Sequence, residues 1–398
     1  IQGTAAADVI NPVQTVAGQP LPTVGDDTIN GDAGNDFING GIGGDIMSGG
    51  LGNDTYFVDN SADQTIEVAG EGIDFVRSTI SWTLAAETEH LTLQGTSAID
   101  GTGNALFNRI DGNDADNVLR GLAGNDKLYG MGGNDTLEGG DQFDQLYGGE
   151  GNDTLNGGAH NDTLMGDNGD DTFLVGLNDG FDVFDGGAGT DTITATADGV
   201  RIGITSVSGV EVFSGGGHAN VVITGTNAAQ TLDFSGATVT GIATIFARGG
   251  DDTMIGSSGN DGLSGEAGND TISGGGGNDR VIGGAGADNL SGNAGADRFI
   301  YFATSESAGA NVDTIFDFSH LEADRIDLHN IDADTITAGD QAFLWIDTAA
   351  FSGVAGELRQ ETVGGVTSLY GDTNGDLIVD LHIDLAGGPA MVLADFLL

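Results

Sequence analysis

Aspartates recur at every ninth residue in three parts of this 398-residue chain. The clearest run spans residues 120–175, where six consecutive units place an Asp at the same position and an apolar residue two places later. Carboxylate oxygens are hard ligands of the kind that Ca²⁺ prefers, and this ion takes six to eight of them. The spacing therefore predicts a series of calcium sites. The sixteen aspartates predicted as metal ligands are Asp27, Asp36, Asp45, Asp54, Asp126, Asp135, Asp144, Asp153, Asp162, Asp171, Asp252, Asp261, Asp270, Asp279, Asp288 and Asp297.

The repeat unit also predicts the elements that position these aspartates. It reads G-G-x-G-x-D-x-U-x, in which U is apolar. Around U we expect a strand of about three residues, whose alternating side chains send U inward. The remaining residues must turn sharply, and glycine enters the positive-φ conformations of such turns without steric cost. Two units then form one coil, with one strand in each of two parallel sheets, and equivalent loops stack at the strand spacing of about 4.8 Å.

This arrangement predicts both a core and a dependence on the ion. Stacked carboxylates repel one another by about 1 kcal/mol per neighbouring pair even in water. We therefore expect the repeats to fold when calcium arrives. The predicted inward side chains are Ile29, Ile38, Met47, Tyr56, Leu128, Leu137, Leu146, Leu155, Leu164, Phe173, Met254, Leu263, Ile272, Val281, Leu290 and Phe299.

Some units depart from the pattern. Asn108 and Asn117 occupy the Asp position, which predicts coils that bind calcium weakly or not at all. A short echo after the central array places Asp182 and Asp191 nine residues apart.

The composition excludes several classes of protein. Lys and Arg number 10 against 61 Asp and Glu, for a formal charge of -51. Nucleic acid and anionic membranes are therefore not expected partners, because both require a basic face. The chain has no cysteine, which excludes disulfides and thiolate metal sites. No apolar run reaches 18 residues, so no membrane span is expected.

Composition and repeats together predict an all-β protein in seven segments. Glycine numbers 72, and it is concentrated in the three arrays. The last hundred residues contain less glycine and more aromatic residues, as expected for a domain that covers the final apolar layer of a coil. The predicted segments are an N-terminal segment (1–23), a first array (24–58), a β connector with calcium-poor coils (59–111), a central array (112–192), a calcium-poor β-solenoid (193–247), a third array (248–299) and a C-terminal cap (300–398).

The three arrays resemble the RTX, or hemolysin-type, calcium-binding β-roll. Residues 313–398 resemble the C-terminal domain of serralysin-type proteases through DTIFDF, DRIDL, GELR, GDTNGD and ADFLL. In that family the domain caps the roll and carries a type I secretion signal, and residues 395–398 match that signal. The resemblance implies a parallel β-roll in three calcium-binding blocks, bound Ca²⁺ at several sites, and secretion by type I machinery to the cell surface or medium.

Other chemistry receives little support, and we predict no catalytic residue. The six histidines lack zinc spacing, and the H-E-x-x-H motif of serralysin-type proteases is absent. There is no G-x-S-x-G motif, and Lys127, the only lysine, lies within a repeat. Paired carboxylates for glycoside chemistry stay open, because acidic residues occur throughout. Residues 372–376 begin like an EF-hand loop, but Leu377 and Ile383 replace the Gly and Glu that would follow, which favours a hairpin turn.

Three hypotheses for function follow, and the third, a carbohydrate-binding adhesin that uses the calcium-poor segment 192–247, has the least support in the sequence. The first is a secreted, non-enzymatic structural protein whose roll folds with calcium and then self-associates or binds a cell-surface polysaccharide. The second is the secretion and folding module of a larger secreted enzyme, such as a protease, a lipase or a polysaccharide-modifying enzyme. The absence of an initiator Met at Ile1 favours the second.

Overall fold

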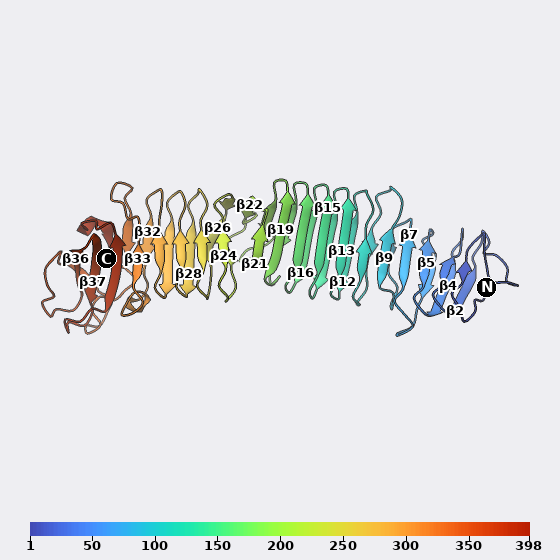
Figure 1. Cartoon of the computed structure of the whole chain (residues 1–398), viewed down its shortest axis with the longest axis horizontal. Helices are drawn as coiled ribbons and strands as arrows, with labels where there is room; N and C mark the ends of the chain where they lie inside the picture. The colour runs from blue at the N-terminus through green and yellow to red at the C-terminus, as the bar shows by residue number, and fades with distance from the viewer. The chain divides into compact units, whose positions relative to one another are not determined.

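A computed structural model describes all 398 residues, which form two compact units. Unit 1 comprises residues 1–196 and 206–210, and unit 2 comprises residues 197–205 and 211–398. Both units are β-structure with only two three-residue 3-10 turns, η1 (Thr304–Glu306) and η2 (Leu393–Asp395) (Figure 1). The fold is a parallel β-solenoid with a β-rich C-terminal part, as predicted. None of its helices has the length and apolar character needed to cross a membrane.

Unit 1 coils between parallel sheets. One sheet pairs, in sequence, β1 (Val9–Ile10), β3 (Phe37–Asn39), β5 (Thr55–Val58), β7 (Phe75–Ser78), β9 (His90–Leu93), β11 (Arg109–Asp111), β13 (Lys127–Gly132), β15 (Gln145–Glu150), β17 (Thr163–Asn168) and β19 (Asp182–Ala188). Opposite it, β2 (Thr28–Ala33), β4 (Ile46–Leu51) and β6 (Gln64–Ile66) pair in one sheet. A further sheet pairs β8 (Trp82–Thr83), β10 (Gly101–Thr102), β12 (Val118–Ala123), β14 (Thr136–Asp141), β16 (Thr154–Ala159), β18 (Thr172–Val175) and β20 (Thr192–Ala195).

The register of unit 1 stacks each apolar U residue on its counterpart one coil away. Leu128 pairs with Leu146, and Leu146 with Leu164. These side chains are buried, with at most 1% of their surface exposed, as are the U residues predicted for the first and third arrays. The predicted inward set is therefore confirmed.

The predicted strand length of about three residues is wrong for much of unit 1. Strands β12 to β17 contain six residues each, because the ladder continues through the residues that follow U, one of which has positive φ in each strand. Leu122, for example, pairs with Gly140. The loops that carry the aspartates are correspondingly shorter and tighter.

Unit 2 repeats the coil. One sheet pairs the first part of β21 (Arg201–Ser208) with β23 (Val221–Thr224), β26 (Ile242–Phe246), β28 (Gly262–Ala267), β30 (Arg280–Ala285), β32 (Arg298–Ile300), β34 (Arg325–Asp327) and β39 (Phe396–Leu397). The facing strands are the pair β22 (Val212–Ser214) and β25 (Thr238–Thr240), and the series β24 (Thr231–Asp233), β27 (Thr253–Ile255), β29 (Thr271–Ser273), β31 (Asn289–Ser291) and β33 (Asp313–Ile315).

The C-terminal part adds an antiparallel meander to this coil. It comprises β36 (Glu357–Val363), β37 (Val366–Asp372) and β38 (Leu381–Ala386), with β35 (Leu344–Trp345) parallel to β36. Strand β38 pairs in parallel with β33, so the meander continues a sheet of the roll. Phe396 pairs with Ile326, so β39 is the last strand of the other sheet. The ring of Phe396 also contacts that of Trp345, with 4.9 Å between the ring centroids.

Candidate calcium sites

Fourteen of the sixteen predicted aspartates accept a hydrogen bond at Oδ1 from the backbone of a neighbouring coil. The N–H of Asp126 donates to Oδ1 of Asp144 at 2.7 Å, and the N–H of Asp135 donates to Oδ1 of Asp153 at 2.7 Å. The same bond recurs along both units between aspartates 18 residues apart. One carboxylate oxygen of each pair therefore holds the coils in register.

The second oxygen, Oδ2, is buried without a hydrogen-bond partner in fourteen of the sixteen predicted ligands. Buried polar atoms are nearly always paired in proteins, so a repeated exception indicates a ligand. These fourteen are Asp36, Asp45, Asp54, Asp126, Asp135, Asp144, Asp153, Asp162, Asp171, Asp252, Asp270, Asp279, Asp288 and Asp297.

The space in front of these oxygens is lined by backbone carbonyls. A Cβ added to Gly130 would lie 2.4 Å from Oδ2 of Asp135 and 2.4 Å from the carbonyl oxygen of Gly148. A Cβ on Gly139 would lie 2.5 Å from Oδ2 of Asp144 and 2.5 Å from the carbonyl oxygen of Gly157. Only glycine fits there, and a carboxylate oxygen and a carbonyl oxygen converge on the same space. This all-oxygen donor set fits Ca²⁺.

Burial disfavours the ionised form of these carboxylates unless a cation is bound. Desolvation raises the pKa of Asp144 to about 8 and the pKa values of Asp135 and Asp279 to about 7, from 3.8. Neighbouring repeat aspartates, such as Asp162 beside Asp144, raise the pKa further, and the backbone donors lower it only in part. A bound cation would supply the missing charge compensation.

The residue four places before the aspartate separates two kinds of loop. In all fourteen loops with an unpartnered Oδ2 this residue has positive φ, from +64° at Asn293 to +115° at Gly140. We call these open loops.

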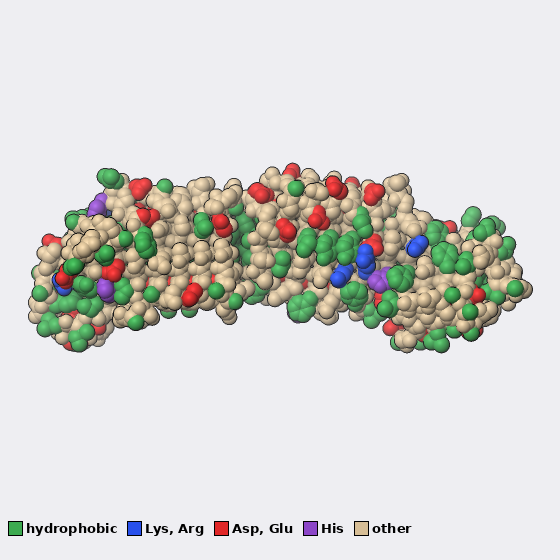
Figure 2. Space-filling view, viewed as in Figure 1, with side chains coloured by type: hydrophobic (Ala, Val, Ile, Leu, Met, Phe, Trp, Pro, Cys, Tyr) green, Lys and Arg blue, Asp and Glu red, His purple; other side chains and the backbone are tan.

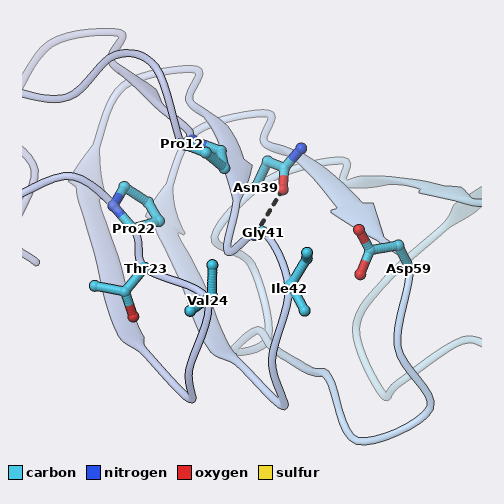
Figure 3. A pocket seen from close by; sticks show the side chains of 8 residues that line it. All are labelled: Pro12, Pro22, Thr23, Val24, Asn39, Gly41, Ile42 and Asp59. Atoms are coloured by element: carbon cyan, nitrogen blue, oxygen red, sulfur yellow. Dashed lines mark hydrogen bonds between the residues drawn. The ribbon is translucent and has the colours of Figure 1, made fainter.

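In the two remaining predicted loops the chain itself satisfies Oδ2. The N–H and hydroxyl of Thr23 donate to Oδ2 of Asp27 at 2.6 and 3.0 Å, and those of Ser257 donate to Oδ2 of Asp261 at 2.7 and 2.8 Å. We call these closed loops. Figure 3 shows Thr23 beside Gly41, the residue at the corresponding position one coil later, in the open loop of Asp45. In the structure Oδ2 of Asp27 and of Asp261 is thus hydrogen-bonded within its own loop, and both residues stay predicted ligands.

The ladder also includes residues that the spacing did not select as ligands. Asp182 and Asp191 accept from Asp162 and Asp171 across 20 residues, and Asp313 accepts from Asp288 across 25. Longer connections displaced these residues from the period of nine. A search for Asp near the start of each following strand would have found them.

Two further predictions concern loops outside the sixteen predicted ligands: the asparagine loops and residues 372–376. The side-chain amide of Asn117 donates to the carbonyl oxygen of Ile99 at 2.7 Å, so asparagine keeps the coil and replaces the charge with a hydrogen bond. Oδ1 of Asp372 accepts from the N–H of Gly375 at 2.7 Å and Oδ2 accepts from that of Leu377 at 3.0 Å. This geometry is the predicted turn.

Two of the surface hollows differ in the number of ionisable residues that line them. One, of about 460 Å³, lies in the N-terminal part of unit 1, and Asp59 is its single ionisable residue (Figure 3). It is lined by Pro12, Pro22, Thr23, Val24, Asn39, Gly41, Ile42 and Asp59. Another, of about 580 Å³, lies over β26, β28 and β30 beside η1 and contains Arg280, Glu266 and Glu306 with Phe246 and Phe302.

Regularly spaced, buried aspartates on parallel coils define a calcium-binding β-roll. The chain carries RTX calcium-binding nonapeptide repeats, whose family model matches residues 23–56, 102–137, 111–146, 138–173 and 178–198. The model of the peptidase M10 serralysin C-terminal domain matches residues 219–398. This match begins well before the predicted residue 313, since it includes the third array.

Individual proteins match over shorter stretches or more weakly. The endo-1,3-1,4-beta-glycanase ExsH of Rhizobium meliloti (strain 1021) is 37% identical over 71 residues, which are 18% of this chain and 13% of that protein. A subunit of the Azotobacter vinelandii mannuronan C5-epimerase covers 43% of this chain and 80% of its own, with 22% identity and a TM-score of 0.29. The extracellular lipase LipA of Serratia marcescens covers 89% of this chain and 67% of its own, with 13% identity and a TM-score of 0.24.

Proposed function

We propose that this is a secreted protein whose β-roll folds when calcium fills its open loops. The observation that carries the proposal is the set of fourteen buried Oδ2 atoms with no partner in the chain. Bringing so many carboxylates into two compact units is unfavourable until a cation compensates them. The free energy of calcium binding then becomes folding free energy.

Calcium levels inside and outside a cell make this dependence useful. Sites of the extracellular class bind with dissociation constants of about 10⁻⁴ to 10⁻³ M, so they stay unfilled in the cytosol. An unfolded chain suits passage through a secretion channel. The serralysin C-terminal domain supports the type I pathway as the route.

Circular dichroism of the full chain tests the folding proposal. In EDTA we expect the spectrum of a largely unfolded chain, and millimolar CaCl₂ should restore β-structure cooperatively. The same concentration of MgCl₂ is the control, because Mg²⁺ demands a near-ideal octahedron and dehydrates reluctantly. A folded roll in EDTA at pH 7.5 would contradict the proposal.

We further propose a structural, non-enzymatic role, with self-association or a cell-surface polysaccharide as the partner. The support is that coils of the roll occupy most of the chain and that the hollow of about 460 Å³ contains a single ionisable residue. Arg280, Glu266 and the aromatic Phe302 in the larger hollow offer polar and stacking contacts of the kind that sugars use.

The second candidate is a calcium-dependent folding module of a larger polysaccharide-modifying enzyme. The match to the beta-glycanase favours it, because that match covers only 13% of the glycanase. Two measurements separate the candidates. A native protein with an intact mass well above 40.1 kDa supports the module. A native mass near that value, with no release of sugar from mixed-linkage β-glucan, supports the structural role.

A further inference from the structure

The end of the first array departs from the repeat in three ways that converge on one place. The U position holds Tyr56, which has a hydroxyl where the other arrays have aliphatic or Phe side chains. Strand β6 pairs Ile66 with Ser48, so Glu67 takes the place one coil after Gly49, where the repeat has a glycine. The next aspartate of the ladder, Asp74, follows Asp54 by 20 residues and accepts from its N–H at 2.7 Å.

These changes assemble three carboxylates. One oxygen each from Asp54, Glu67 and Asp74 lies within 4.8 Å of the others, and no other group of three in the chain meets this limit. Two ligand oxygens on opposite sides of a Ca²⁺ ion at about 2.4 Å are separated by about 4.8 Å. One ion can therefore contact all three.

The hydrogen bonds of the cluster leave buried carboxylate oxygens without a partner. Asp54 is fully buried, Asp74 is 1% exposed, and Oδ2 of Asp54 has no partner. The hydroxyl of Tyr56 accepts from the N–H of Gly49 at 2.5 Å and donates to Oε1 of Glu67. Tyr56 thus positions Glu67, whose Oε2 is also buried and unpartnered.

We propose that Asp54, Glu67 and Asp74 form a three-carboxylate calcium site at the end of the first array. It differs from the open loops, where one carboxylate faces backbone carbonyls, and its greater charge makes it the tightest site of the chain. The choice of calcium rests on the proposed function of the repeats, whereas the site itself rests on the geometry of these three residues.

Long-wavelength diffraction from crystals of the full chain grown in CaCl₂ tests the site, because calcium scatters anomalously there. We expect an anomalous peak at bonding distance from all three carboxylates. The Glu67→Gln variant should lose that peak and keep those of the other loops. The control is Glu87→Gln, which removes one charge from the same connector and should keep every peak. Equilibrium dialysis with radioactive calcium should show the first ion bound about tenfold more weakly by Glu67→Gln.

The possible failures are distinct. Peaks in the open loops with none touching Glu67 and Asp74, or full occupancy in Glu67→Gln, would overturn the site alone. Absence of peaks from the central and third arrays, with a peak among these three carboxylates, would overturn the proposed function and leave the site standing. Tyr56→Phe keeps all three carboxylates, and it should weaken the first binding event by removing the donor that orients Glu67.

Discussion

At each open loop the two oxygens of one carboxylate have different roles. Oδ1 of Asp144 accepts from the backbone of the preceding coil at 2.7 Å, and its Oδ2 faces a space lined by glycine carbonyls. Asparagine links the coils in another way: the Oδ1 of Asn117 accepts from the N–H of Asn113 in its own loop, and its side-chain amide donates to the carbonyl oxygen of Ile99 in the preceding coil. Its amide nitrogen cannot bind a cation. The metal and structural roles are therefore separable by mutation.

Asp144→Asn should accordingly lose calcium while the coil remains folded. We expect at least one fewer bound ion at millimolar calcium, measured by equilibrium dialysis. Asp261→Asn is the matched control: Oδ2 of Asp261 is already satisfied by Ser257, so its calcium count should be unchanged. Equal losses from the two variants would contradict the distinction between open and closed loops.

The residue four places before the aspartate should control whether a loop is open. Ser257→Gly removes the hydroxyl that caps Asp261 and permits the positive φ of the open loops. We expect this variant to bind one more calcium ion than the natural chain. The neighbouring exposed Ser258→Gly should bind the same number as the natural chain. A Ser257→Gly variant that folds with an unchanged calcium count would show that this residue does not decide metal binding.

Acid should partly replace calcium. Burial raises the pKa of Asp36 from 3.8 to about 6 and that of Asp144 to about 8, and it raises the pKa of other open-loop aspartates in the same direction. Within that window the metal-free roll binds more protons than the unfolded chain, so its stability falls as the pH rises. In EDTA we expect more β-structure by circular dichroism at pH 5.5 than at pH 7.5. Calcium affinity should change in the opposite direction, because protons compete for the same oxygens. A chelated chain with the same spectrum at both pH values would refute this account.

At the scale of strands and coils, the sequence predicted what depends on period and side-chain polarity. Alternation placed Leu146 inward, and the period of nine placed it between Leu128 and Leu164. Strand length could not be read in this way, because the residues after U are compatible both with a turn and with pairing to the neighbouring coil. Closed loops were missed for a different reason. Thr23 and Ser257 were visible, but only coordinates show that their donors reach the carboxylate.

The coil predicts that a core substitution acts mainly on neighbouring coils. Leu146→Ala removes a fully buried side chain stacked between two other leucines, and it should cost about 2–5 kcal/mol of unfolding free energy. Met165→Ala, on the outward face of β17, should cost less than about 1 kcal/mol. Guanidinium unfolding of both variants at saturating calcium measures the difference. Equal costs would mean that the stacked U residues are not the main source of stability.

At the scale of the whole molecule, charge is the dominant property. The formal charge is -51, yet the repeat aspartates lie inside the coils, and Figure 2 shows acidic side chains scattered over the visible face without forming a stripe. Calcium in the loops compensates only the buried carboxylates, so folded molecules still repel one another through exposed ones. Self-association therefore needs more calcium than folding does.

Electron microscopy of the purified chain across a calcium series examines this last consequence. If the protein is structural, ordered sheets or filaments should appear at millimolar calcium, above the concentration at which circular dichroism shows a complete fold. Magnesium added to the calcium-folded chain is the informative control, because it screens exposed carboxylates without being suited to the loops. Assembly driven by magnesium would assign the contacts to charge screening, whereas assembly only with calcium would assign them to specific ions between molecules. Dispersed monomers at every calcium concentration would leave the folding switch intact, would contradict self-assembly, and would favour the module of a larger secreted enzyme.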